Sequence, residues 1–358
     1  KTAMTESSSQ SVVNRNRLSI RIWLAIVAIA IFALVIVGGA TRLTDSGLSI
    51  TQWKPIHGVV PPLTQDEWQE ELALYKQIPE YEQINKGMTL SEFKYIYWWE
   101  WTHRLLARGV GVLFAIPLLV FWVSGRIERR VKLPLLGIMA LGGLQGFIGW
   151  WMVSSGLVDR VDVSQYRLAT HLTLACIIVA AIVWVSRGLA HYSSDKAPSD
   201  ASGKVAAMIA IMVLVQIYLG GLVAGLDAGL AYNTWPWMDG AAVPANLLVM
   251  KPLWVNLFEN AKTVQFTHRT FAYVLWLVAL GHMVASLRLA PGSTHARRSM
   301  VLFALVTIQA VFGITTLLLQ VPVSWALLHQ GMALVVLAFA VAHWRAFIGS
   351  YPLPVKQE

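Results

Sequence analysis

The sequence predicts an all-α integral membrane protein whose eight transmembrane helices form two pseudo-twofold-related four-helix bundles. Three observations support this fold class. Of the 358 residues, 56% are hydrophobic and only 13% are charged, whereas a soluble domain carries roughly a quarter charged residues. Eight stretches are apolar over the roughly 20 residues that a bilayer crossing needs. The second half of the chain also repeats motifs of the first half in the same order.

The cysteine content and the net charge exclude several classes of protein. Cys176 falls inside an apolar run and is the only cysteine, so an intrachain disulfide and a cysteine-based zinc or iron–sulfur site are excluded. The net charge of +9 reports topology in a membrane protein, and no basic patch indicates nucleic-acid binding. Metal chemistry must therefore use histidine, carboxylate or methionine side chains.

The expected spans follow one another along the chain. The first lies between Arg21 and Arg42, where no residue is charged, and it is longer than the apolar core of a signal peptide. The stretch from Met300 to Trp344 is too long for one helix, and Pro322 in the sequence LLQVPVSW divides it. The expected spans are 22–41, 98–125, 132–159, 167–187, 205–226, 264–287 and two within 300–344.

Basic residues orient the spans. Lysine and arginine precede the first span, follow the last, and fill every second connection, so these segments and both termini are expected in the cytoplasm. Residues 63–97 lie outside and are predicted to form an amphipathic helical segment, which packs at the interface, caps the first site or binds a partner. The expected parts are a disordered cytoplasmic tail at 1–21, an N-terminal half at 22–190 with a long outer loop at 42–97, a linker at 191–203, a C-terminal half at 204–347 and a tail at 348–358.

The repeat relates the two halves position by position. GGATRLTDSGLSITQWKPIHGVVPP, from Gly38, aligns with GGLVAGLDAGLAYNTWPWMDGAAVP, from Gly220. QGFIG in the third span matches QAVFG in the seventh, and a THR motif opens the second and sixth. Four spans per half is an even number, so the halves insert with the same polarity about an axis along the membrane normal. The glycine pairs and the Gln-x-x-x-Gly patterns predict close helix packing.

Four histidines occupy matched positions in the two halves. His103 and His268 begin the second and sixth spans, and His171 and His329 lie about one turn into the fourth and eighth. All four are expected at one depth in the outer half of the membrane. A lone buried histidine is usually a core residue, but two facing imidazoles in a four-helix bundle suit bis-histidine haem ligation. Zinc would need further ligands nearby. The sequence therefore favours two haem sites, one in each half.

Charged side chains at the helix mouths add two hypotheses. Arg104, Arg108 and Arg269 are placed to pair with haem propionates, and interfacial anchoring is the alternative. Glu100 stands where the second half has Gln265, on the helix face of the following histidine. A carboxylate can take a proton or stabilise a developing cation, whereas an amide cannot; the alternative role of Glu100 is charge balance. This asymmetry predicts a reactive first half and a cofactor-bearing second half.

The motifs GGATRLTDSGLSITQWKPIHGVVPP, EWTHRLLARGVG and QFTHRTFAYVL resemble those of the haem A synthase family, and the resemblance runs from the first span to the eighth. It implies an oxidoreductase that converts the C8 methyl group of haem O to a formyl group by successive hydroxylations, giving haem A for cytochrome oxidase biogenesis. It also implies that His268 and His329 hold a haem B cofactor. His103 and His171 would flank the iron of the substrate haem O, and Glu100 would be the essential acid beside the oxidised methyl.

The resemblance also carries expectations about surroundings and partners. The chain lacks the cysteine pair that some bacterial members have in the outer loops and is more similar to the proteobacterial and mitochondrial branch. Glu6 makes the tail unlike a transit peptide, which favours a bacterial cytoplasmic membrane. The expected partners are haem O, an electron acceptor, the lipid bilayer, haem O synthase, oxidase assembly factors and a second copy of the chain. A dihaem b-type electron carrier and a haem transporter or chaperone are the alternative functions.

Overall fold

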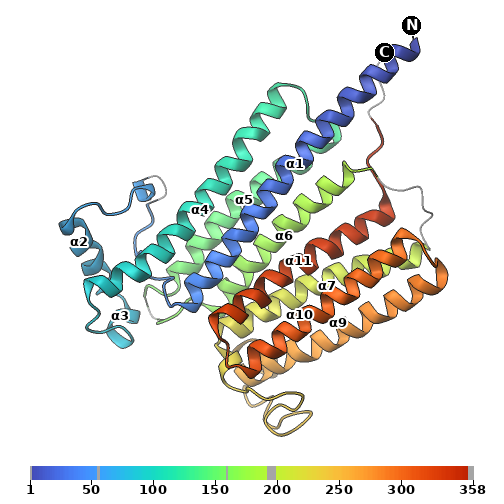
Figure 1. The fold of residues 1–358 in the computed structure, drawn as a ribbon. Helices are drawn as coiled ribbons and strands as arrows, with labels where there is room; N and C mark the ends of the chain where they lie inside the picture. Colours follow the sequence, from blue (N-terminus) through green and yellow to red (C-terminus); the bar gives the residue numbers. More distant parts are fainter. Residues whose placement is uncertain (1, 55–56, 159, 192–198, 354–358) are drawn as a thin grey trace.

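The computed structural model shows a helical protein and describes residues 2–54, 57–158, 160–191 and 199–353 (Figure 1). Within these ranges eight helices are long and apolar enough to cross a membrane, which confirms the predicted number. The chain is a multi-pass membrane protein. The eight helices are α1 (Thr2–Leu43), α4 (Leu90–Val123), α5 (Arg129–Ser154), α6 (Gln165–Gly188), α7 (Asp200–Gly225), α9 (Ala261–Leu289), α10 (Thr294–Leu318) and α11 (Val323–Ile348).

These helices make two rings of four. In the first half, α1 and α5 each contact both α4 and α6, so α4 and α6 stand on one diagonal of the ring. In the second half, α7 and α10 each contact both α9 and α11, so α9 and α11 take the equivalent diagonal. The rings meet where α6 packs against α7 and α11, and where α1 packs against α11 (Figure 1). The pseudo-twofold relation between the rings stays a prediction.

The proline break predicted between the last two spans is confirmed. Pro322 is the N-cap of α11, and the two preceding residues, Gln320 and Val321, adopt left-handed backbone with φ of 61° and 56°. Proline lacks the N–H that would continue a helix, so α10 ends and the chain reverses. The Thr316 hydroxyl donates to the carbonyl of Trp325 (3.1 Å), which joins the two helices across the turn.

The outer loop of the first half folds into short helices that pack on the start of α4. Trp68 packs edge-on against Tyr97, with ring centroids 4.9 Å apart, and Tyr75 lies 5.3 Å from Phe93. This confirms that part of segment 63–97 is helical. The outer elements are η1 (His57–Val59), α2 (Gln65–Tyr75) and α3 (Pro79–Gln83) in the first half, and η2 (Ala228–Leu230), η3 (Leu253–Val255) and α8 (Asn256–Glu259) in the second.

Helix α1 begins at Thr2, so residues 10–21 are helical where the sequence analysis expects part of a disordered tail. That expectation was wrong because a tertiary contact holds the segment. Arg17 is 4% exposed, and its guanidinium donates to both carboxylate oxygens of Glu128 at 2.5 and 3.0 Å. The same group donates to the carbonyls of Tyr351 (3.1 Å) and Pro352 (2.9 Å). The start of α1 is thereby tied to the α4–α5 connection and to the C-terminal segment.

The start of α1 and the end of α11 lie at one end of the bundle, and α2, α3 and the segment after α7 lie at the other (Figure 1). Most of the expected linker, 192–198, lies outside the described residues, and 200–203 already belong to α7. Helix α11 ends at Ile348, where the expected C-terminal tail begins, and residues 354–358 of that tail also lie outside the described residues.

Candidate functional site

Each half brings two of the four predicted histidines together. His103 on α4 and His171 on α6 are close enough to interact electrostatically, and so are His268 on α9 and His329 on α11. All four side chains are partly buried. In both halves the two helices are the diagonal pair of the ring, so a ligand bound between the imidazoles would lie on the bundle axis. This is the arrangement that suits an axially ligated cofactor.

Every one of these four rings lies against a glycine on a flanking helix. A Cβ atom added at each glycine would come within about 3 Å of the ring, closer than real Cβ contacts allow at three of the four positions. The distances from that Cβ to the nearest ring atom are 2.9 Å from Gly38 to His103, 2.9 Å from Gly149 to His171, 3.2 Å from Gly220 to His268 and 2.8 Å from Gly313 to His329. The glycines therefore make the space that the imidazoles occupy.

The Gln-x-x-x-Gly patterns act on the second histidine of each pair. Gln145 donates through Nε2 to the carbonyl of His171 (3.0 Å), and Gln309 donates in the same way to His329 (3.0 Å). The glycine that ends each pattern contacts the same imidazole ring. The predicted close packing therefore serves to position two candidate ligands.

One residue near the site has no counterpart in the sequence analysis. Gln216 on α7 donates through Nε2 to the carbonyl of His268 (3.0 Å) and lies 3.0 Å from the imidazole Nδ1. Its matched position in the first half is Leu34, four residues before the Gly-Gly pair in each half. Comparing the repeats at that position would have revealed the difference.

The donor set fits haem iron. The Nδ1 atoms of His171 and His329 are buried and lack a hydrogen-bond partner in the part of the chain that the structure describes. Within the same residues no group of three or more histidine, cysteine or acidic side chains is arranged to hold a metal ion. Two imidazoles without further protein ligands are what bis-histidine haem ligation requires, and a zinc site requires more.

Glu100 is buried, and donors occupy both of its carboxylate oxygens. Arg104 donates to Oε1 from Nε (3.1 Å) and Nη2 (2.6 Å), while the Ser49 hydroxyl (2.8 Å) and the Ile50 amide (2.7 Å) donate to Oε2. Arg104 also donates to the carbonyls of Ile50 (2.8 Å) and Gln52 (3.2 Å). Charge balance with Arg104, the alternative that the sequence left open, is therefore present. The carboxylate also fixes the beginning of the outer loop beside His103.

The second half repeats this arrangement with an amide. Gln265 accepts from Nη2 of Arg269 at 2.7 Å and donates through Nε2 to the carbonyl of Ala228 at 2.6 Å. Arg269 donates to the carbonyls of Tyr232 and Thr234, both at 2.8 Å. The loop carbonyls that bind the arginine are at matched positions in the two halves. The two halves therefore differ chemically at this matched position by one group, the carboxylate of Glu100 in the first half and the amide of Gln265 in the second.

The three arginines expected to bind propionates lie inside α4 and α9, because α4 begins at Leu90 rather than at the predicted 98, and they donate to outer-loop carbonyls. Arg108 follows the pattern of the other two, donating through Nη2 to the carbonyl of Lys54 at 3.0 Å. The Nε atom of Arg269 is buried and has no hydrogen-bond partner among the described residues. Contact with propionates stays a prediction.

Three further histidines, which are not among the four candidate ligands, come together at the opposite end of the second half. His282 on α9 and His343 on α11 are 4% and 1% exposed, and their Nε2 atoms are 2.8 Å apart. His295, near the start of α10, interacts with His343. His282 and His343 each follow a candidate ligand, His268 or His329, by fourteen residues on the same helix. Fourteen residues are close to four helical turns, so this spacing would have predicted a shared face.

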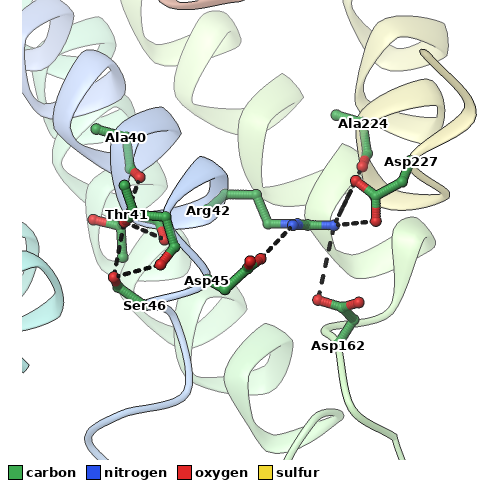
Figure 2. A network of polar contacts seen from close by, with 9 residues as sticks. Ala40, Thr41, Arg42, Asp45, Ser46, Asp162, Ala224 and Asp227 are labelled. Atoms are coloured by element: carbon green, nitrogen blue, oxygen red, sulfur yellow. Dashed lines mark hydrogen bonds and ion pairs between the residues drawn. The ribbon is translucent and has the colours of Figure 1, made fainter. Parts of the chain in front are cut away.

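A polar network joins the halves near the outer ends of α1 and α7 (Figure 2). Arg42 donates to both carboxylate oxygens of Asp227 (3.0 and 3.2 Å), to the carbonyl of Ala224 (3.4 Å) and to Asp45 (3.4 Å). Asp162 lies 3.8 Å from the same guanidinium. Asp45 and Asp227 are matched by the repeat, and both adopt left-handed backbone with φ of 49° and 48°. One arginine therefore contacts equivalent aspartates of both halves.

Comparison with known proteins identifies the family. The profile of a family described as "Cytochrome oxidase assembly protein" matches residues 21–341. The chain belongs to this family. Relatives named "Heme A synthase" occur in Rhizobium meliloti (70% identity over 338 residues, 94% of this chain and 92% of the relative), Sinorhizobium fredii (66% over 357 residues, 99% and 97%) and Agrobacterium fabrum (60% over 344 residues, 96% and 94%). The resemblance indicated by the sequence motifs is therefore confirmed along most of the chain.

Proposed function

We propose that this protein is a haem A synthase, an oxidoreductase that converts the C8 methyl group of haem O to a formyl group and so supplies haem A for cytochrome oxidase. One observation carries this proposal: each helix ring holds a pair of imidazoles on its diagonal helices, and each imidazole lies against a glycine. Relatives named "Heme A synthase" support the same reaction over nearly the full chain. Haem O is the substrate, and the reaction takes place within the bilayer.

The two pairs have different tasks in this proposal. His268 and His329 hold haem B in the second half, and His103 and His171 flank the iron of haem O in the first. When bound, haem B supplies one-electron oxidation and reduction. The glycines and glutamines of the flanking helices orient the imidazoles toward the bundle axis. The Glu100 carboxylate, present only in the first half, supports the placement of the reaction there.

We assign Glu100 an electrostatic role. Oxidation of a methyl group conjugated to a macrocycle places positive charge on that carbon, and a fixed carboxylate stabilises it. Arg104, Ser49 and Ile50 already donate to both oxygens of Glu100, so the carboxylate is held in place and both oxygens already accept hydrogen bonds. This favours charge stabilisation over proton transfer among the roles that a carboxylate can take here.

Three arginines of α4 and α9 complete the two sites. We propose that Arg104 and Arg108 serve the propionates of haem O, and that Arg269 serves those of haem B. Each projects from the helix that carries a ligand histidine, and guanidinium groups pair well with carboxylates. The unpartnered Nε of Arg269 supports this assignment.

We also propose a bacterial cytoplasmic membrane as the location, with both termini in the cytoplasm. The start of α1 and the end of α11 lie at one end of the bundle (Figure 1), and basic connections gather at the cytoplasmic side of membrane proteins. The histidine pairs then lie toward the outer leaflet.

The mass of the bound pigment tests the function. The full-length protein is purified from cells that make haem O, and the extracted pigment is analysed by mass spectrometry. Haem B together with haem O, its hydroxylated form or haem A is the expected result. Haem B alone would favour a dihaem electron carrier, and a bound haem that is never oxidised would favour a transporter. Either outcome contradicts the proposal.

A further inference from the structure

We infer that Gln216 and its counterpart Leu34 decide which of the two sites retains its haem and which exchanges it, an inference that rests on the proposed function. A cofactor must stay bound through many reaction cycles, whereas the substrate must enter and the product must leave. Both sites use two imidazoles, so the difference in retention must come from the residues that support those imidazoles.

The main-chain support of the second histidine in each pair is the same in both halves. His171 and His329 each receive a hydrogen bond on the carbonyl from a glutamine, at 3.0 Å in both cases. Each ring also contacts a glycine, Gly149 or Gly313, at a similar distance of 2.9 or 2.8 Å from a Cβ built there. Nε2 of Gln145 also lies 3.5 Å from Nε2 of His171, at the limit of a hydrogen bond, but Nδ1 has no partner on either histidine among the described residues.

The support of the first histidine differs. In the second half the Gln216 amide lies 3.0 Å from Nδ1 of His268 and also bonds the main chain of that residue. The matched side chain in the first half is Leu34, which has no polar group, and no hydrogen bond to the His103 side chain is found among the described residues. The difference between the two pairs is therefore concentrated on this ligand.

A hydrogen-bonding partner at Nδ1 strengthens an imidazole ligand. It fixes the tautomer so that Nε2 faces the metal, holds the ring in orientation and raises its basicity, and its loss typically lowers metal affinity about 10–100-fold. The amide oxygen and nitrogen of glutamine are alike in shape. To accept from Nδ1–H of His268, the Gln216 amide turns over, so that its oxygen, which is buried without a partner, takes the place of Nε2 and the bond from Nε2 to the His268 carbonyl is given up. His103 has no such partner among the described residues, so its ring is held less firmly than that of His268.

Exchange of the two side chains tests the inference. The full-length protein, with its haems bound, is mixed in detergent with apomyoglobin as the haem acceptor, and the transferred haem is identified by mass. Gln216→Leu should release haem B at least about 10-fold faster than the unaltered protein. Leu34→Gln should slow the release of haem O by a similar factor. Gln216→Glu, which keeps an acceptor on the same stem, should restore retention of haem B.

His268→Ala separates this inference from the proposed function. If His268→Ala loses haem B while Gln216→Leu keeps it at the unaltered rate, the inference is wrong and the ligand assignment stands. If His268→Ala also keeps haem B, the ligand assignment fails and the inference fails with it. Size-exclusion elution and thermal unfolding identify any variant that does not fold, and Leu34→Gln then decides the question through the release of haem O.

Discussion

Glu100 and Gln265 show how small the chemical difference between the two halves is at the level of single residues. Both are 3% exposed, both receive a bond from an arginine one turn later, and both fix the start of an outer loop. The fold therefore accepts either side chain at this position. Only the charge is special to the first half, and a charge that the architecture does not require is best explained by the reaction.

Glu100→Gln should abolish haem A formation while leaving the haem content unchanged. Removal of one preorganised electrostatic group typically lowers turnover about 10²–10³-fold, and the amide can adopt the bonding seen at Gln265. The product mass and the ratio of haem to protein measure the two effects. Gln265→Glu is the matched control and should keep its activity. Full turnover by Glu100→Gln would refute the assigned role.

Glu80 in α3 is a second buried acid of the first half, 4% exposed. Burial, followed by the negative charges of Glu100, Asp162 and Asp45, raises the pKa of Glu80 to about 8, and Tyr75 partly opposes this shift. The folded protein therefore keeps this proton where the unfolded chain has lost it. Between roughly pH 4.5 and pH 8 the folded state loses stability as the pH rises.

Glu80→Gln should remove this pH dependence because the amide does not titrate. Thermal unfolding of both proteins at pH 5 and pH 8.5 measures the effect. The variant should gain stability relative to the unaltered protein at the higher pH, by an amount of the order of a few kcal/mol. A constant difference between the two proteins across this range would show that Glu80 is not protonated in the folded state.

At the scale of helices, the glycines of a flanking helix do not all have the same role. Helix α5 carries Gly149 against His171, yet a Cβ at Gly146 on the same helix would meet no atom within 4 Å. The first glycine is required by a close approach, whereas the second stands in open space on the outer surface of the helix. This difference separates the glycines that shape the site from those that do not.

Gly149→Ala should displace the His171 ring and lower the haem O content severalfold, because the new Cβ would lie 2.9 Å from Cε1 of the ring. Overpacking of this kind typically costs about 1–3 kcal/mol, so the protein should still fold. Gly146→Ala is the matched control and should bind haem normally, with a helix stabilised by up to about 1 kcal/mol. The haem content is measured by absorption of the extracted pigment. Equal haem contents in the two variants would show that Gly149 is not needed to make space for the His171 ring.

At the scale of the whole molecule, the rings are held together by packing and by one polar network. Gly221 on α7 faces the backbone of α6, where a Cβ would lie 2.8 Å from the Cα of Ala169. On the other side, Gln330 on α11 donates to the carbonyl of Val35 on α1 at 2.8 Å. Arg42 adds the charged contact at the outer end (Figure 2). The distance between the two histidine pairs is therefore fixed by helices α1, α6, α7 and α11.

Arg42→Met should destabilise the contact between the halves by about 1–2 kcal/mol. Each ion pair of Arg42 is with an aspartate that is 44% to 70% exposed, so each contributes only about 0–1 kcal/mol. The substitution also leaves three neighbouring aspartates without a cation. Lys54→Met is the control, since its pair with Glu71 lies within one outer loop. Thermal unfolding compares the two variants; equal losses would show that Arg42 does not join the halves.

The number of spans, the duplicated halves and the four histidines could all be predicted from the sequence. Hydropathy is a local property of about 20 consecutive residues, and a repeat is visible as soon as matched letters such as the two THR motifs are aligned. The pairing of the histidines followed from their matched positions at the beginning of spans. The role of Glu100 was predictable only as two alternatives, since its partners Ser49 and Ile50 lie about fifty residues away in the sequence.

Only the tertiary structure decided the contacts between distant segments. The ion pair of Arg17 with Glu128 holds in place a segment that was expected to be a disordered tail. Gln216 contacts the imidazole of His268, and Arg42 forms an ion pair with Asp227 in the other half. No hydrophobic periodicity and no shared motif in the sequence predicts any of these three contacts. Such contacts depend on helix rotation and on the closeness that glycine allows between helices. The sequence alone therefore determined which side chains can take part in the chemistry, and tertiary packing decided which contacts hold each of them in position.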